Sequence, residues 1–144
     1  MKAFVTSILC VFTLFVSSCK KDRESQPEKS LIGDWRETEL NGFTRSVKFT
    51  QDRSFFLSIG HDDGNGIMYA GEYRIKGDSL IVSTKEMLVQ EPGKVGQRTA
   101  TTYPLYEKAT FNVNGDTLTL KYITYPADGP VPTTAKFRRM ITID

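Results

Sequence analysis

The chain has 144 residues, of which 39% are hydrophobic and 25% are charged, and its formal net charge is +2 at pH 7. This length fits one domain, and this composition is typical of a globular protein and excludes a chain that is disordered throughout. The nearly balanced charge gives no electrostatic basis for binding nucleic acid.

Residues 1–18 differ from the rest of the chain. Lys2 gives a positive start, residues 3–16 carry no charge, and two small serines follow. This apolar run is shorter than the roughly 20 residues that are needed to cross a bilayer. The pattern therefore predicts a signal peptide over residues 1–18 rather than a membrane-spanning helix.

The end of this segment resembles a lipidation motif. Val16, Ser17, Ser18 and Cys19 resemble the lipobox of bacterial lipoproteins, which implies cleavage before Cys19 and acylation of that cysteine. Two acyl chains are enough for stable anchoring, so the resemblance predicts a protein held on a membrane through Cys19. Because aspartate does not follow the cysteine, the resemblance implies the outer membrane, and it leaves open whether the domain faces the periplasm or the cell exterior.

Three regions follow from this reading: the signal peptide, a lipidated cysteine with a polar tether over residues 19–30, and a folded domain over residues 31–144. Cys10 lies in the segment to be removed and Cys19 would carry lipid, so the domain has no cysteine for a disulfide. A packed core alone must then stabilise it.

The folded region reads as strands and turns. Short runs rich in Val, Ile, Thr, Phe and Tyr alternate with Gly, Asp and Asn, and apolar residues recur at every second position. This alternation predicts an all-β, antiparallel up-and-down barrel of about eight strands, with a two-sheet β-sandwich as the alternative. The predicted strands cover residues 33–40, 44–50, 54–59, 67–75, 79–89, 103–113, 117–125 and 134–141.

The turns divide into two groups at opposite rims of such a barrel. Gly77-Asp78 and Gly115-Asp116 predict tight hairpins, and Asp52 has the same place in a third one without a glycine. The other rim carries connections at residues 41–42, 60–66, 90–102 and 126–133, and three of these four are long. Long loops on a rigid scaffold are a usual place for binding, so we predict the mouth there. The alternative is that they are tolerated insertions.

The start of the domain resembles a known family. Gly33-Asp34-Trp35 resembles the Gly-x-Trp opening of lipocalins, and more closely that of the lipocalin-like domains of bacterial lipoproteins. The resemblance implies that Trp35 plugs the closed end, that Arg138 or Arg139 covers its ring, and that the barrel binds a small apolar ligand. The long loops fall later in this chain than in classical lipocalins, so ligand contacts cannot be transferred.

The lining of the mouth is predicted from strand alternation alone. For each candidate the alternative is an ordinary core residue, because aromatic side chains often fill small barrels. If the barrel is filled, the long loops, including Pro126 to Pro132, would form a protein- or glycan-interaction module instead. The predicted lining residues are Leu40, Ile59, Tyr69, Tyr103, Tyr122 and Tyr125.

The sequence contains few signals of metal binding or catalysis. His61 stands beside Asp62 and Asp63, but the spacing does not match a calcium loop and these residue types favour turns. Neither a nucleophile motif nor a phosphate-binding glycine loop is present. We therefore expect no metal, no cofactor and no enzymatic activity. An enzyme built on inward-facing carboxylates is the remaining alternative, and it predicts an inward Asp or Glu with a strongly shifted pKa.

Overall fold

The computed structural model describes residues 26–141, so the predicted signal peptide, Cys19 and most of the predicted tether lie outside the described residues. No helix within this range is long and apolar enough to cross a membrane. The elements are one short helix, α1 (Gln26–Leu31), and the strands β1 (Gly33–Glu37), β2 (Phe43–Phe49), β3 (Ser54–His61), β4 (Gly66–Lys76), β5 (Ser79–Gln90), β6 (Gln97–Ala100), β7 (Glu107–Asn114), β8 (Thr117–Thr124) and β9 (Val131–Arg139).

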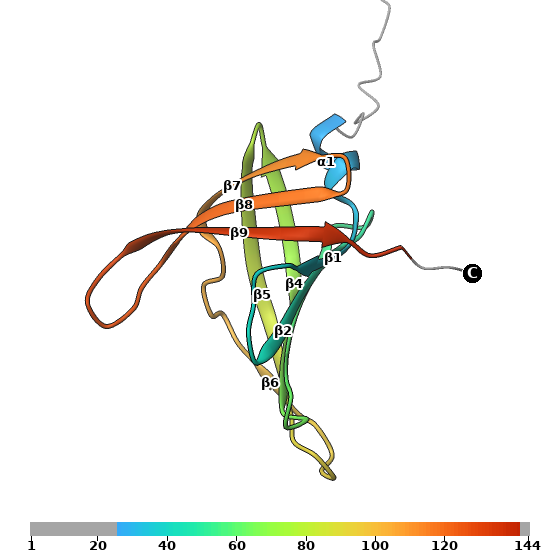
Figure 1. Cartoon of the computed structure of the whole chain (residues 1–144), viewed down its shortest axis with the longest axis vertical. Coiled ribbons are helices and arrows are strands. Elements are labelled where there is room, and N and C mark those ends of the chain that lie inside the picture. The colour runs from blue at the N-terminus through green and yellow to red at the C-terminus, as the bar shows by residue number, and fades with distance from the viewer. Residues whose placement is uncertain (1–25, 142–144) are drawn as a thin grey trace, which may run out of the picture.

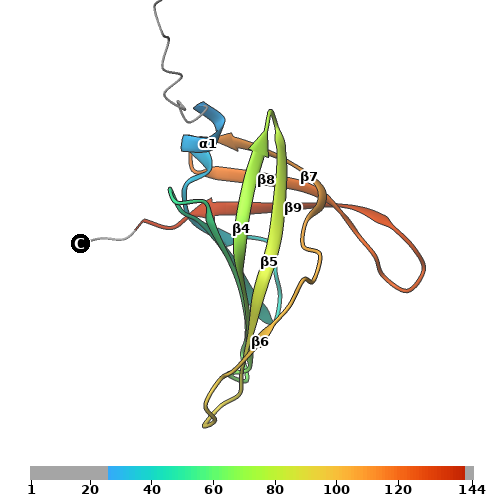
Figure 2. The same ribbon diagram turned by 180° about the vertical axis from the view of Figure 1, so that it is seen from behind.

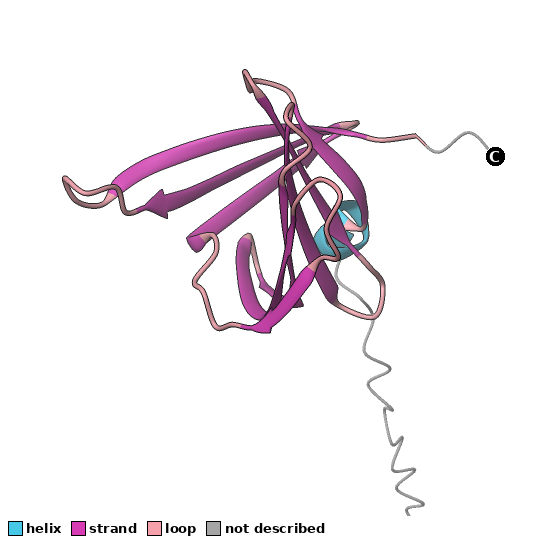
Figure 3. Cartoon of the chain, turned by 90° about the horizontal axis from the view of Figure 1, so that it is seen from below, coloured by secondary structure: helices cyan, strands magenta, loops and turns pink. Residues whose placement is uncertain are grey.

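The strands form a closed antiparallel barrel. They follow the order β4-β3-β2-β1-β9-β8-β7-β5-β6, and β4 also pairs with β5, which closes a ring of eight strands and leaves β6 outside as an extension of β5. Figure 1 shows β7, β8 and β9 running across the direction of β4 and β5, and Figure 3 shows the strands from below. The predicted all-β barrel is confirmed, and the closed ring excludes the two-sheet sandwich.

Alternation along the strands builds the core. Val47 and Phe49 point inward from β2 and face Leu57 and Phe55 of β3 directly across the ladder, and each of the four side chains is at most 3% exposed. Such aromatic and aliphatic cross-strand pairs stabilise a sheet by roughly 0.2 to 1 kcal/mol each. The largest fully buried side chains are Trp35, Tyr73, Phe49, Phe55, Phe137, Leu31, Leu80, Leu118, Leu120 and Val47.

The connections alternate between two rims of the barrel; on one of them the β8–β9 connection projects to one side, and the β3–β4 and β5–β6 connections lie at the bottom of Figures 1 and 2. The end with the tight turns at residues 51–53, 77–78 and 115–116 is called the closed end, and the end with the connections at residues 38–42, 62–65, 91–106 and 125–130 is called the open end. Gly77 and Gly115 have φ of 65° and 57°, the left-handed conformation that glycine adopts without strain. In the third turn Arg53 takes this conformation, at φ 66°.

The closed end is sealed by α1, Trp35 and Arg139. Trp35 is fully buried and its Nε1 donates a hydrogen bond of 2.8 Å to the Leu31 carbonyl. Arg139 lies over the indole, with its Cζ 4.1 Å from the ring centroid, and its Nη1 and Nη2 each donate at 2.8 Å to the Ile32 and Ser30 carbonyls. These bonds satisfy carbonyls that the end of the helix leaves without partners. Arg138, the other predicted cover, is exposed.

The sequence did not predict α1 or β6. Leu31 of α1 is fully buried and Glu28 is 7% exposed, so the folded part begins before the predicted boundary at residue 31. β6 lies in the predicted loop over residues 90–102, and all of its residues are exposed. The strand predicted over residues 103–113 begins only at Glu107, because residues 101–106 run beside β5 without forming a regular strand.

The contact between β5 and β7 is short. These strands pair only at Ser79 with Thr110 and at Leu80 with Ala109, although β5 pairs with β4 along its whole length. Beyond these pairs, the segment of residues 101–106 runs beside β5. It is held by a 2.6 Å hydrogen bond from Thr84 Oγ1 to the Tyr103 carbonyl. The wall of the barrel is therefore completed there by a loop instead of a strand.

Candidate functional site

A cavity of about 460 Å³ opens at the open end of the barrel. This volume is within the range of roughly 300 to 1,000 Å³ that is typical of sites for small molecules. The walls come from β2, β3, β4 and β8 and from the segment that precedes β7. The lining residues are Arg45, Leu57, Ile59, Tyr69, Tyr103, Pro104, Leu105, Tyr106, Glu107, Tyr122, Ile123, Thr124 and Tyr125.

The structure places five of the six predicted lining residues at this cavity. Ile59, Tyr69, Tyr103, Tyr122 and Tyr125 all border it. The sixth, Leu40, does not border it, because β1 ends at Glu37 and Leu40 lies in the connection to β2. The first strand was predicted to reach residue 40, but it ends at Glu37 and the connection to β2 is longer than predicted.

Tyrosines surround the mouth of the cavity. Tyr103 and Tyr125 are 56% and 58% exposed, whereas Tyr122 is 7% exposed and lies deeper. The rings of Tyr69 and Tyr103 stack with centroids 5.8 Å apart, which joins β4 to the segment before β7. Rings of this kind offer flat apolar faces together with a polar hydroxyl at one edge.

Tyr106 is a lining residue that the sequence did not single out. It is 6% exposed, and its ring packs edge-on against Tyr122 at 4.8 Å and against Phe55 at 6.1 Å between centroids. Its φ of 52° is unusual for a residue with a large side chain and costs about 1 to 2 kcal/mol. The surrounding contacts hold the residue in this strained conformation.

The hydroxyl of Tyr106 is buried, and among the described residues it has no hydrogen-bond partner. Burial raises the pKa of Tyr106 far above its usual value, even though the nearby Arg45 guanidinium acts in the opposite direction. The group therefore stays protonated and can donate a hydrogen bond. A buried hydroxyl without a partner costs about 1 to 3 kcal/mol, so most such groups in folded proteins are satisfied.

An ion pair lies inside the barrel next to this hydroxyl. Arg45 Nη2 donates to Glu37 Oε1 at 2.8 Å and its Nε donates to Oε2, so the pair is bidentate. The side chains of Glu37 and Arg45 are 6% and 22% exposed. Both follow the inward row of their strands, Glu37 two residues after Trp35 and Arg45 two residues before Val47. Strand alternation could therefore have revealed the pair.

The electrostatics of this pair keep Arg45 charged. Burial alone would lower the pKa of Arg45, but the hydrogen bonds to Glu37 and the neighbouring Tyr106 and Tyr122 raise it above its ordinary value. A buried charge is tolerated only when it is paired and hydrogen-bonded, and Glu37 supplies that partner. The interior of the cavity therefore combines apolar walls with one neutralised polar spot.

The acidic turn at His61 is built by local hydrogen bonds. Asp63 accepts bonds from the Asn65 backbone nitrogen at 2.9 Å and from its side-chain amide at 2.7 Å. Within residues 26–141 no group of three or more His, Cys, Asp or Glu side chains could hold a metal ion. No residue of this turn is among those that line the cavity.

No protein-family model, curated protein or solved structure matches the chain. The resemblance to lipocalin-like domains of lipoproteins, based on Gly33 to Trp35, stays a prediction. The barrel, its cavity and the lining residues are thus the basis for a function.

Proposed function

We propose that the chain is a membrane-anchored lipoprotein whose lipocalin-like barrel binds a small apolar ligand in the cavity at its open end. The cavity of about 460 Å³, with aliphatic and aromatic walls, is the observation that carries this proposal. Burial of apolar surface contributes about 25 cal/mol per Å², so an apolar ligand that fills the cavity and contacts these walls gains several kcal/mol of binding free energy. We propose a binding role for the cavity and no catalytic one.

The position of α1 at the closed end is consistent with a barrel that is anchored through its N-terminal segment. The described chain begins with α1, which packs beside the Trp35 plug at the closed end (Figure 1). Lipid on Cys19, seven positions before α1, would attach at that end, and the cavity would face away from the membrane. We propose the outer membrane as the location, in line with the lipobox resemblance.

A second candidate function uses the connection between β8 and β9. This hairpin projects from the barrel in both Figure 1 and Figure 3. Its exposed apolar side chains include Tyr125 and Val131, which are 58% and 45% exposed, and it contains Pro126 and Pro130. A projecting arm of this composition favours recognition of a protein or a glycan, the role expected if the cavity takes no ligand.

The two functions are separated by what the purified protein carries. Residues 20–144 are expressed without lipid, purified, extracted under denaturing conditions and analysed by mass spectrometry. A stoichiometric apolar compound, together with binding of fluorescent fatty acids, supports the ligand-binding function. An empty extract and no binding across the fatty-acid panel would instead favour recognition through the β8–β9 arm.

A further inference from the structure

We infer that the cavity recognises an amphipathic ligand by an uncharged oxygen acceptor, such as a hydroxyl or a carbonyl, which is bound beside Tyr106 and Arg45. The inference rests on the proposed function and makes it more specific. It concerns the polar end of the ligand, whereas the apolar walls would hold the rest of the molecule.

The unpartnered hydroxyl of Tyr106 is the first observation. Tyr106 borders the cavity, and its hydroxyl is buried without a hydrogen-bond partner among the described residues. Its strained backbone and its two edge-on ring contacts fix its position. An occupant with an acceptor oxygen would satisfy this donor, and an alkane would leave it unsatisfied.

Arg45 supplies further donors at the same place. A guanidinium has five N–H groups. Glu37 engages the Nε and Nη2 atoms of Arg45, and the Tyr122 hydroxyl also hydrogen-bonds to this guanidinium, so not all of the five N–H groups are used. Arg45 also lines the cavity and interacts with the hydroxyls of Tyr106 and Tyr122. The donors of Arg45 and Tyr106 therefore lie together next to the cavity.

The charge balance decides against an anionic ligand. Glu37 neutralises Arg45 through a bidentate pair, so this part of the cavity has no net positive charge. Glu107 adds a second carboxylate to the lining. A bound carboxylate would approach Glu37 and Glu107 and lose its hydration without gaining an unpaired cation. A neutral oxygen can accept the same hydrogen bonds without that repulsion.

The test uses residues 20–144 at pH 8 and the neutral fluorescent probe N-phenyl-1-naphthylamine, which carries no oxygen. The probe is displaced by 1-decanol or by decanoate, which differ only at the polar end. We expect decanol to displace the probe at lower concentration than decanoate. With each displacement corrected for that protein's own probe affinity, Tyr106→Phe should weaken decanol binding roughly three- to tenfold, the effect of one hydrogen bond.

Two variants complete the test. Tyr73→Phe removes another buried tyrosine hydroxyl, which donates to the Thr50 carbonyl at 2.8 Å near the closed end, and it should leave the decanol affinity unchanged. Glu37→Gln removes the charge that balances Arg45, and it should shift the preference from decanol toward decanoate by about tenfold or more.

The outcomes separate the two claims. If the probe does not bind to the wild-type protein, the proposed ligand-binding function fails and the inference fails with it. If the probe binds, but decanoate binds as tightly as decanol and Tyr106→Phe changes neither, the cavity is a plain apolar site. The inference is then overturned while the proposed function stands. Decanol preference that is lost in Tyr106→Phe supports the inference.

Discussion

Replacing Tyr106 with phenylalanine should stabilise the ligand-free protein. The substitution removes a buried hydroxyl that has no partner and keeps the ring that packs against Phe55 and Tyr122. The desolvation cost of such a group is about 1 to 3 kcal/mol, so we expect a gain of about 1 kcal/mol in the free energy of unfolding. With a urea m-value of roughly 2 kcal/mol per M, the midpoint should rise by about 0.5 M.

Tyr73→Phe is the matched comparison. It removes the same atom from another tyrosine of the core, but there the hydroxyl donates to the Thr50 carbonyl, so we expect a loss of about 1 kcal/mol. Both variants are measured by urea unfolding, followed by circular dichroism, on protein from which bound compounds have been removed. Equal destabilisation by the two substitutions would show that the Tyr106 hydroxyl is satisfied in the folded protein, and the reasoning on its role would be refuted.

Three further predictions test other parts of the structure. Gly71→Ala should destabilise by more than about 2 kcal/mol in urea unfolding, because an added Cβ would lie 2.1 Å from a backbone oxygen of β5; a loss under 0.5 kcal/mol would contradict this contact. Arg139→Met should lower the free energy of unfolding by about 2 to 4 kcal/mol, because the contact with the Trp35 ring and the hydrogen bonds to carbonyls are lost. Arg138 is exposed, so Arg138→Met should change this free energy by less than about 0.5 kcal/mol, and equal losses in the two variants would refute the role of Arg139 at the closed end. Burial raises the pKa of Tyr106 in the folded protein above the value of 10.0 in the unfolded chain, so the unfolded chain loses this proton first and the free energy of unfolding falls as the pH rises above 10.0. Thermal unfolding from pH 8 to 11 should therefore show a smaller loss of stability at alkaline pH in Tyr106→Phe than in the wild type, and an equal loss would contradict the burial of this hydroxyl.

The barrel could be predicted because local patterns and the global fold agree. Strands such as β2, β3 and β8 carry apolar residues at alternating positions, and Gly77 and Gly115 mark turns that need positive φ. The helix α1 was missed because its sequence is polar and six residues long, and its stability depends on contacts that only the folded barrel provides. β6 was missed because its side chains are all exposed and show no alternation.

The cavity could be predicted in outline only. Ile59, Tyr69 and Tyr122 follow from strand alternation, but Tyr106 was assigned to a regular strand, and its strained turn is set by the short pairing of β5 with β7. Glu37 and Arg45 occupy inward positions of the same alternation. Alternation could have marked both as inward, but charged residues are usually exposed, so it does not by itself predict that they are buried.

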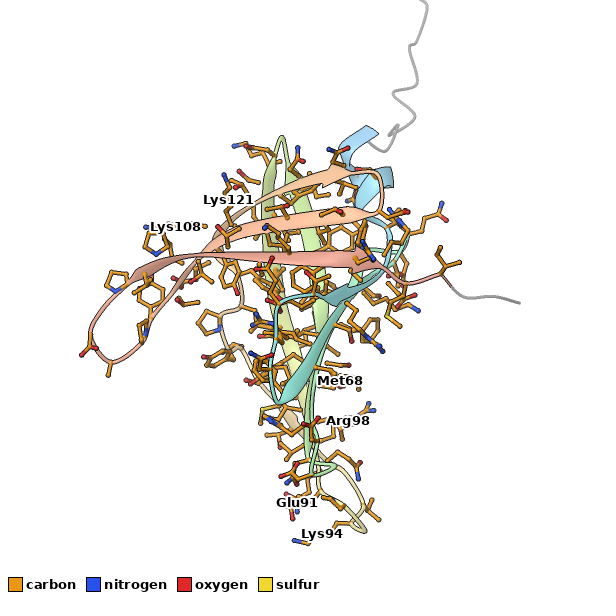
Figure 4. All side chains as sticks on the ribbon, viewed as in Figure 1. Met68, Glu91, Lys94, Arg98, Lys108 and Lys121 are labelled. Carbon is orange, nitrogen blue, oxygen red and sulfur yellow. The ribbon has the colours of Figure 1, made fainter. Side chains whose placement is uncertain are left out.

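The central claim, that the cavity binds a small apolar ligand, is tested most directly by fluorescence titration with N-phenyl-1-naphthylamine. The titration compares the wild-type protein with two variants. Ile59→Trp places a bulky indole ring in the cavity in place of an aliphatic side chain, and Lys121→Trp places the same ring at an exposed position on β8 (Figure 4). We predict saturable binding to the wild type and to Lys121→Trp and at least a tenfold loss of affinity in Ile59→Trp. Equal binding to all three proteins, or binding to none, would contradict the claim.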